Sequence, residues 1–111
     1  LIVTGGVGVS GQVTATTVVE TSSIVFKENV NPIEDALNKI LQLVGVTYDR
    51  KDGSKINEAG LIAEEVNKVL PNLVSKDEEG NAYGLQYTKL VAYLIESVKT
   101  LNTRIEQLET K

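Results

Sequence analysis

Residues 87–111, YTKLVAYLIESVKTLNTRIEQLETK, carry the apolar repeat of a coiled coil. Apolar side chains recur at alternating spacings of three and four, which places them at heptad positions a and d. These residues are Val91, Leu94, Val98, Leu101, Ile105 and Leu108. Arg104 falls at a g position and Glu109 at the following e, where coiled coils form interhelical salt bridges. Leu90 and Ile95 widen the stripe near its beginning. We therefore expect the first part of this helix to pack on its own domain and the last two heptads to meet partner helices.

The preceding residues 24–86 predict a small body of helices and a hairpin. A helix is expected from Asn31 as N-cap, with Pro32 in the first turn, to a stop at Gly45. A strand at VTYD, a polar turn, a second amphipathic helix and a closing hairpin follow along the chain. We expect the second helix to supply core residues, namely Leu61, Ile62 and Val66.

Residues 1–23, LIVTGGVGVSGQVTATTVVETSS, alternate apolar and polar side chains with a period of two. That period is typical of strands with one buried face. Nothing within the segment offers a helix to pack on, and an isolated strand or hairpin is marginal at best. We expect it to pair with copies of itself or with upstream structure. Its GVGVSG run, residues 6–11, matches a dinucleotide-binding pattern, but the β-branched residues that follow argue against the helix which that pattern needs.

Composition excludes several classes of function. The chain has 111 residues, a net charge of −4, no cysteine and no histidine, so thiol or imidazole catalysis and ordinary zinc sites are excluded. We expect no nucleic-acid partner, no membrane partner, no cofactor and no metal. The acidic residues Asp77, Glu78 and Glu79 lack the spaced ligands of a calcium loop and are expected to form a solvated hairpin turn.

Three motifs carry a resemblance to a known family. They are SSIVFKENV at 22–30, GLIAEEVNKVLPNLV at 60–74 and LQYTKLVAYLIESVKTLNTRIEQLE at 85–109. From Ser22 onward the chain resembles the C-terminal intramolecular chaperone domain of phage endosialidases, tail spikes and tail fibres. The resemblance implies an α+β fold with a β-rich N-terminal stem, a small helix–hairpin body and a long C-terminal helix forming a trimeric coiled coil. Residues 1–22 would be the end of the stem and 23–111 the chaperone domain, with the long helix at 87–111.

The resemblance also implies an activity. Members of this family assemble a homotrimeric fibre of which they are the C-terminal part and then cut themselves off with a serine–lysine pair five residues apart. Aligning the family's KEN motif places the pair at Ser22 and Lys27, with cleavage of the Ser22–Ser23 bond. Ser23 and Val25 stand where the family has Asp and Arg. The implied partners are two copies of the same chain and its upstream fibre. The implied location is a virion tail precursor assembled in the host cytoplasm, from which the chaperone part is released.

The geometry of a strand leaves three possibilities open for this pair. In a straight strand Ser22 and Lys27 point to opposite faces, whereas Ser23 and Lys27 share one. Either the chain bends, or the lysine serves another chain, or Ser23 is the nucleophile. A lysine acts as a base only when burial or a nearby cation lowers its pKa from about 10.4. We expect the apolar residues before Lys27 to desolvate it once trimer packing covers them.

Two further alternatives concern the assembly. The coiled-coil end and the stem are equally explained by an inert trimerisation module without proteolytic activity. β-Branched residues at a with leucine at d favour two strands in isolated peptides, whereas the resemblance implies three chains. The stem and body would bury more apolar area than the heptads, so we expect a parallel homotrimer.

Overall fold

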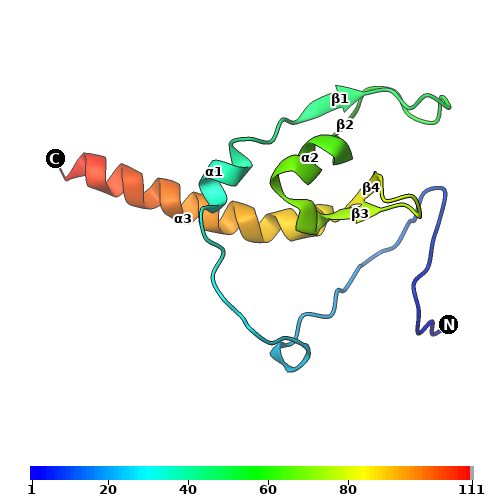
Figure 1. The fold of residues 1–111 in the computed structure, drawn as a ribbon, viewed down its shortest axis with the longest axis horizontal. Coiled ribbons are helices and arrows are strands. Elements are labelled where there is room, and N and C mark those ends of the chain that lie inside the picture. The colour runs from blue at the N-terminus through cyan, green and yellow to red at the C-terminus, as the bar shows by residue number, and fades with distance from the viewer. Residues whose placement is uncertain (111) are drawn as a thin grey trace. The chain divides into compact units, whose positions relative to one another are not determined.

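The computed structural model describes residues 1–110, which divide into two units, Leu1–Asn31 and Pro32–Lys111. Helices and short strands alternate along the second unit, and a long helix is its last element, so the α+β prediction is confirmed (Figure 1). Among the described residues no helix is long and apolar enough to cross a membrane.

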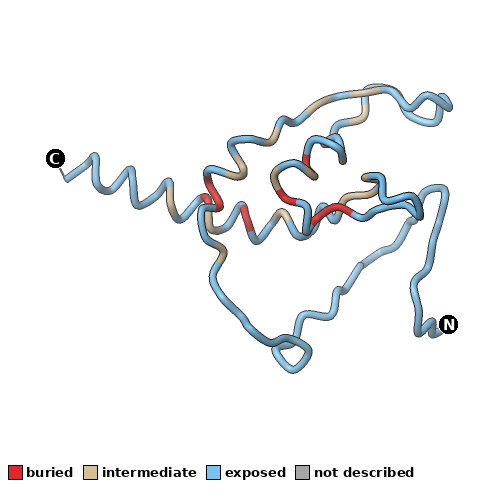
Figure 2. Tube along the Cα trace, viewed as in Figure 1, coloured by how far each residue is buried: buried red, intermediate tan, exposed pale blue. Residues whose placement is uncertain are grey.

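The first unit contains a single regular element, the 3-10 turn η1 at Ile24–Phe26. The stem strands predicted within residues 1–23 are not formed in this single chain, and every side chain of the unit is exposed (Figure 2). A period-two pattern gives a strand only when a neighbouring strand completes the hydrogen-bond ladder. No helix follows the GVGVSG run, as the sequence predicted.

The first helix of the second unit is shorter than predicted. Helix α1 spans Ala36–Ile40 rather than Pro32 to Val44. Its N-cap is Asp35, whose backbone has φ 58° and whose side chain makes no capping hydrogen bond. The predicted cap was wrong because Asn31 donates its side-chain amide to the carbonyl of Asn29, at 2.9 Å. The left-handed turn at Asp35 prevents a regular helix from running back to Pro32.

An antiparallel hairpin follows α1. Strand β1, Val46–Tyr48, pairs with β2, Glu58–Gly60, so that Tyr48 lies opposite Glu58. Between them the polar turn includes Gly53 at φ 80°, a conformation that favours glycine. The strand and the turn were predicted. Strand β2 was not, since the sequence favoured a helix beginning close to it.

The second helix and the closing hairpin pack together. Helix α2, Ala63–Val69, contacts both strands of the hairpin, β3 at Val74–Lys76 and β4 at Ala82–Leu85. The 3-10 turn η2, Pro71–Leu73, connects α2 to β3, so the predicted stop at Pro71 is confirmed. In the hairpin turn Asp77 Oδ1 accepts the backbone N–H groups of Glu79 and Asn81, at 3.0 and 2.9 Å. Its carboxylate organises an exposed turn, which agrees with the prediction for this segment.

The core of the second unit is small and lies where α1, α2, β3 and the last helix meet (Figure 2). Val66 is fully buried and Leu61 packs against the cluster. The prediction of Ile62 as a core residue was wrong, because its side chain is 40% exposed. Ile62 precedes α2 with an extended backbone, so its side chain lies off the helical stripe. The buried apolar residues of the cluster are Ala36, Val66, Leu70, Leu73, Val74 and Tyr93.

The long helix α3, Leu90–Glu109, follows the 3-10 turn η3 at Tyr87–Lys89. Leu90 packs against the core, while Tyr93 and Ser97 are buried, so the first half of α3 packs on its own unit as predicted. Ile95 was wrongly placed on that side, since it is exposed. The six heptad residues are all exposed in the single chain, and the second half of α3 extends away from the rest of its unit (Figure 1). Lys111, the last residue of the predicted helix, lies outside the described residues.

Candidate functional site

The 3-10 turn η1 brings the predicted serine and lysine together. Phe26 N–H donates to the Ser23 carbonyl at 3.1 Å, and Lys27 N–H donates to the Ile24 carbonyl at 3.0 Å. This reversal of the chain lets the Lys27 ammonium donate to Ser22 Oγ, with 2.7 Å between Nζ and Oγ. Of the three possibilities left open by the sequence, the structure has the bent chain.

The hydroxyl of the next residue, Ser23, caps the turn η1 instead of contacting Lys27. Ser23 is the N-cap of η1, and its Oγ accepts the backbone N–H of Val25 at 3.3 Å. Its oxygen therefore stabilises the turn that carries Lys27 toward Ser22. Ser22 is the hydroxyl in contact with the amine, so it is the better placed of the two to lose a proton to Lys27. A neutral amine would accept the hydroxyl hydrogen across the same short distance.

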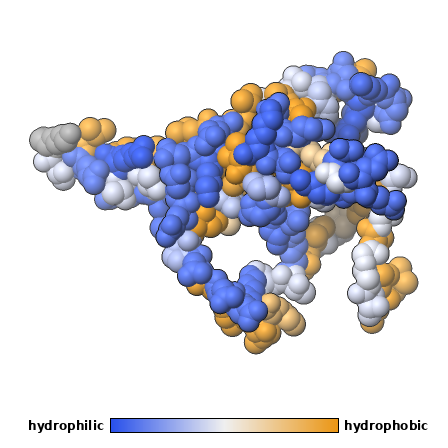
Figure 3. All heavy atoms as spheres, in the orientation of Figure 1, coloured by the Kyte–Doolittle hydropathy of each residue, from blue (hydrophilic) through white to orange (hydrophobic). Residues whose placement is uncertain are grey.

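The apolar side chains next to this pair have no cover in the single chain. Ile24, Val25 and Phe26 are each at least 66% exposed, and this turn appears as a hydrophobic (orange) surface in Figure 3. Ser22 and Lys27 are exposed as well. Three adjacent apolar side chains beside an amine are suited to desolvating it when another surface covers them.

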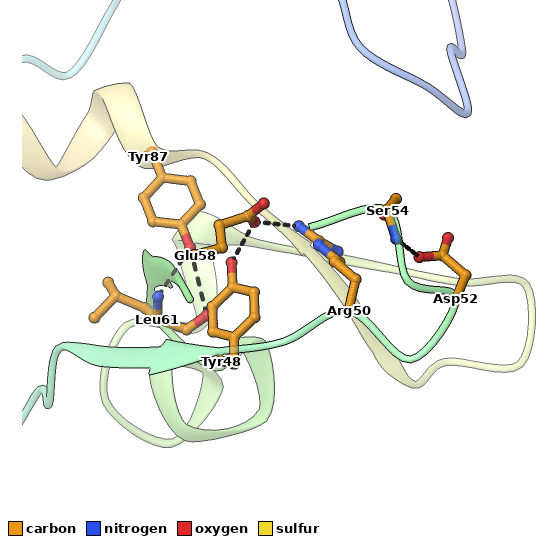
Figure 4. A network of polar contacts seen from close by, with 7 residues as sticks. All are labelled: Tyr48, Arg50, Asp52, Ser54, Glu58, Leu61 and Tyr87. Atoms are coloured by element: carbon orange, nitrogen blue, oxygen red, sulfur yellow. Dashed lines mark hydrogen bonds and ion pairs between the residues drawn. The ribbon is translucent and has the colours of Figure 1, made fainter. Parts of the chain in front are cut away.

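A second cluster of polar contacts lies in the Pro32–Lys111 unit, around the β1–β2 hairpin (Figure 4). Glu58 Oε1 accepts both the Tyr48 hydroxyl and Arg50 Nη2, each at 2.7 Å. The Arg50 guanidinium carbon also lies 5.4 Å from the centre of the Tyr48 ring. Tyr87 Oη accepts the backbone N–H of Leu61 at 2.9 Å. The Tyr87 contact joins the segment before α3 to the residue that links β2 to α2.

The charges in this cluster shift one another's titration. Hydrogen bonds from Arg50 and then Tyr48 lower the pKa of Glu58. The same hydrogen bond to Glu58, followed by burial, raises the pKa of Tyr48, and Glu58 raises the pKa of Arg50. In the adjacent turn, hydrogen bonds from Ser54 lower the pKa of Asp52. All of these shifts favour the form in which the network is fully hydrogen-bonded.

An open hollow of about 330 Å³ adjoins this cluster. Its lining includes three tyrosines, Tyr48, Tyr83 and Tyr87, together with Arg50 and Glu64. Within residues 1–110 no group of three or more His, Cys, Asp or Glu side chains is arranged to hold a metal ion. The hollow thus has a polar, aromatic wall, and the guanidinium of Arg50 in that wall is paired with Glu58.

A third surface feature is the apolar side of α3. Four of its exposed residues, together with Lys99, line a shallow hollow of about 350 Å³. The four are Val91, Leu94, Ile95 and Val98. Because Tyr93 and Ser97 face the core, the helix carries two separate faces, one packed on its own unit and one open.

Comparison with known proteins identifies the family. Residues 22–75 match a family model described as chaperone of endosialidase, and the family is named as a peptidase family. The match begins at the serine that Lys27 contacts. The chain carries a domain of the chaperone-of-endosialidase family. Two of the three motifs that suggested this family, SSIVFKENV and GLIAEEVNKVLPNLV, lie within the matched residues, whereas the motif at 85–109 lies beyond them.

Curated relatives of the chaperone domain are tail-fibre proteins. The chain is 40% identical over 97 residues to the long tail fiber protein Gp37 of Enterobacteria phage K3 and to that of Enterobacteria phage T2. Each alignment covers 81% of this chain but only 8% and 7% of those relatives. The Gp37 protein of Enterobacteria phage M1 is 34% identical over 93 residues, which is 77% of this chain and 37% of that protein. The chain thus spans under a tenth of the length of the first two relatives.

Sequence reasoning missed two features around the chaperone domain. The contact between Tyr87 and Leu61, beside the Glu58 cluster, joins residues 26 positions apart, and local patterns carry no signal for such a distance. The buried face of α3 was also missed at Tyr93 and Ser97. Its signal was present, since Leu90, Tyr93 and Ser97 follow the helical spacings of three and four.

Proposed function

We propose that this chain is an intramolecular trimerisation chaperone of a phage tail fibre that releases itself by serine–lysine autoproteolysis at Ser22–Ser23. The observation that carries the proposal is the 2.7 Å contact between Ser22 Oγ and Lys27 Nζ at the first residue of the family match. The relatives are long tail fiber proteins, which supports assigning this chain to a tail fibre. The peptidase name of the family supports self-cleavage.

The chain then has two parts with different fates. Residues 1–22 are the end of the β-rich stem that stays with the fibre, and residues 23–111 are the chaperone that leaves. The exposure of residues 1–23 supports this division, because an apolar period-two segment without a ladder is suited to pairing with further strands. The product location is the virion tail, and the precursor is assembled in the host cytoplasm.

The reaction follows from the pair. Lys27 in its neutral form takes the hydroxyl proton of Ser22, and the resulting alkoxide attacks a backbone carbonyl. The amine then passes the proton to the leaving nitrogen, and water hydrolyses the ester that remains. Covering the apolar turn η1 by neighbouring chains disfavours the charged ammonium, so assembly switches on the base.

The open face of α3 is the proposed trimer contact. Its six heptad residues, Val91, Leu94, Val98, Leu101, Ile105 and Leu108, are exposed in the single chain and lie on the side away from the core. Three parallel helices would bury this seam and bring the three copies of η1 to the same level. The stem adds a second set of contacts, which favours three chains over the two that the heptad residues alone prefer.

An inert trimerisation module is the alternative function. The same open face of α3 favours it, because assembly needs only that surface. The two functions differ in the covalent state of the chain. A self-cleaving module yields residues 1–22 and 23–111 as separate pieces, whereas an inert one keeps the mass of the intact chain.

Intact-mass spectrometry of the freshly expressed chain tests the proposal. We expect the wild-type chain to be cut after Ser22. Ser22→Ala and Lys27→Ala should each abolish cleavage while trimers still form, because exposed side chains contribute little to stability. Exposed residues of the same types outside the pair serve as controls, and Ser10→Ala and Lys51→Ala should be cut like the wild type.

Three results would contradict parts of this assignment. A wild-type chain that stays intact after trimer formation would favour the alternative function, an inert trimerisation module. Cleavage that persists at the same bond in Ser22→Ala would transfer the nucleophile to Ser23. Isolated monomers that cut as fast as trimers would remove the link between assembly and activation.

A further inference from the structure

The covalent geometry of serine restricts which carbonyl Ser22 can attack. Oγ is bonded to Cβ, Cβ to Cα, and Cα to the carbonyl carbon of the same residue. Attack of Ser22 Oγ on its own carbonyl would close a four-membered ring, which forces bond angles near 90°, far outside the few degrees that proteins tolerate at modest cost. The Ser22–Ser23 bond is therefore out of reach of the hydroxyl that lies beside it.

The other hydroxyl near this bond is no substitute. Ser23 Oγ is attached to the nitrogen side of the bond and could close a five-membered ring, but it accepts the Val25 N–H in the cap of η1. The lysine contact is made to Ser22. The structure thus pairs the base with a hydroxyl that cannot cut its own chain at this position.

We propose that cleavage occurs between chains, with Ser22 and Lys27 of one chain cutting the bond that follows the partner's Ser22. This inference rests on the proposed self-cleavage and names the partner in it. The nucleophile and the base come from one chain, because Oγ and Nζ are 2.7 Å apart within it. The substrate is the equivalent exposed segment of a neighbouring copy, which a parallel assembly holds at the same level.

The chemical step balances without a further reagent. Lys27 removes the Ser22 hydroxyl proton, and Oγ bonds to the carbonyl carbon of the partner's Ser22. The tetrahedral intermediate collapses as the carbon–nitrogen bond breaks, and the proton on Lys27 passes to the departing amine of the partner's Ser23. Water then hydrolyses the ester between the two chains, which restores the Ser22 hydroxyl and leaves a carboxylate on the cut stem.

Threefold symmetry allows each chain to act once and be cut once. In a ring of three, the first chain attacks the second, the second the third, and the third the first. A monomer has no neighbour to supply the carbonyl, so the requirement for assembly includes the substrate as well as the base.

Mixed trimers test this inference directly. A chain carrying both Ser22→Ala and Lys27→Ala and an affinity tag lacks the nucleophile and the base, and alone it should stay intact. Co-expressed with an equal amount of untagged wild-type chain, about half of the tagged chains should be cut after residue 22, because random assembly gives each a wild-type attacker half of the time. Light scattering of the tag-purified material verifies that mixed trimers have formed.

A second mixture tests whether the pair belongs to one chain. Ser22→Ala chains mixed with Lys27→Ala chains should remain uncut in mixed trimers, since neither chain holds the whole pair. Cleavage in this mixture would show that the lysine serves another chain and overturn the pairing within a chain.

Three outcomes separate the possibilities. Tagged chains that stay intact in verified mixed trimers, while the wild-type chains beside them are cut, overturn cleavage between chains. A released fragment that begins with Ser22 rather than Ser23 also overturns it, because attack within the chain on the Thr21 carbonyl would close a permitted five-membered ring. Wild-type trimers that remain uncut would instead refute the proposed function itself.

Discussion

The two units of this chain use apolar side chains in opposite ways. In Pro32–Lys111, apolar residues from α1, α2, β3 and α3 converge on one core. In Leu1–Asn31, valines and isoleucines are about twice as frequent as in the second unit, yet every side chain is exposed and no strand forms. The difference lies in what each pattern needs. Helical stripes and short hairpins find their partners within a chain, whereas a period-two segment needs a neighbouring strand. The first unit therefore lacks, within this single chain, the neighbouring strand that its pattern needs.

The largest effect is expected from removing a core side chain of the second unit. Leu70 is 1% exposed, and Leu70→Ala should lower the free energy of unfolding by about 2–5 kcal/mol, since it leaves a cavity. That is a large share of the stability of a small domain. Urea unfolding followed by circular dichroism measures it. Leu41→Ala, at a position that is 69% exposed, is the matched control and should change little.

The Leu70→Ala variant also tests whether folding precedes cleavage. Under the proposed function, Leu70→Ala protein that cannot fold should remain uncleaved, because the proposed trimer cannot assemble. Clean cleavage after Ser22 in an unfolded Leu70→Ala chain would contradict that order.

The next largest effect is expected from placing charges on the open face of α3, and it should weaken association between chains rather than folding. The double change Leu101→Asp with Ile105→Asp should weaken association by about a hundredfold or more, because it buries charges in an apolar seam. Cleavage should fall with it, while the melting of the second unit stays near that of the wild type. Sedimentation equilibrium measures the association.

The control for the α3 variant places the same charges elsewhere on the helix. Thr103→Asp with Gln107→Asp lies on the opposite side, is exposed, and should leave association intact. If both double variants weakened association equally, the added negative charge alone would explain the loss, and the heptad residues of α3 would not be the contact surface. A wild-type mass of two chains would contradict the trimer.

A smaller effect is expected where three segments meet at Gly60. A Cβ at this position would lie 2.8 Å from Tyr87 Oη and 2.9 Å from Tyr48 Oη, and both hydroxyls are engaged in hydrogen bonds. Gly60→Ala should therefore cost about 1–3 kcal/mol as the rings move aside. At Gly45 an added Cβ meets nothing within 4 Å, so Gly45→Ala should be nearly neutral. Equal melting temperatures for the two variants would refute the crowding.

The smallest effect is expected at Glu58, and it depends on pH. Its pKa in the folded chain is lowered by Arg50 and Tyr48, so its contribution is present above the pKa of the unfolded state, about 4.3, and is lost as the pH falls through the folded value. Glu58→Gln should lower the melting temperature slightly at pH 7, and the difference should vanish in acid. Glu78→Gln, on the exposed hairpin turn, is the matched control variant.

Much of the second unit could be predicted because its signals are local. Turns with Asp52-Gly53 and with Asp77 to Gly80 mark hairpins by the conformations they permit. The errors arise where tertiary contacts override a local pattern. Glu58–Gly60 follows β1 after the polar connection 49–57 and pairs with it as a strand, although the residues that follow it favour a helix. Asp35 takes a left-handed backbone that no capping rule anticipates.

The candidate site was only partly accessible to sequence reasoning. The spacing of Ser22 and Lys27 came from the family resemblance, whereas strand geometry placed the two side chains on opposite faces. The turn η1, three residues of 3-10 helix capped by Ser23, reverses the chain and so brings the two side chains into contact. Hydrophobic residues such as Ile24, Val25 and Phe26 gave no sign of a turn, since β-branched and aromatic types favour strands. Only the cap at Ser23 was a local signal.

The position of the Ser22–Lys27 contact has a consequence for synthesis. Both residues leave the ribosome before any part of α3, because the chain grows from its N-terminus. At roughly 5–20 residues per second, the stretch from Lys27 to Glu109 takes about 4–16 seconds to translate. Throughout that interval the nascent chain contains Ser22 and Lys27 but not the whole of α3. Under the proposed function, a truncated transcript that lacks α3 therefore yields chains that are not cut after Ser22. Incomplete chains would then differ from finished ones by the residues they retain beyond Ser22.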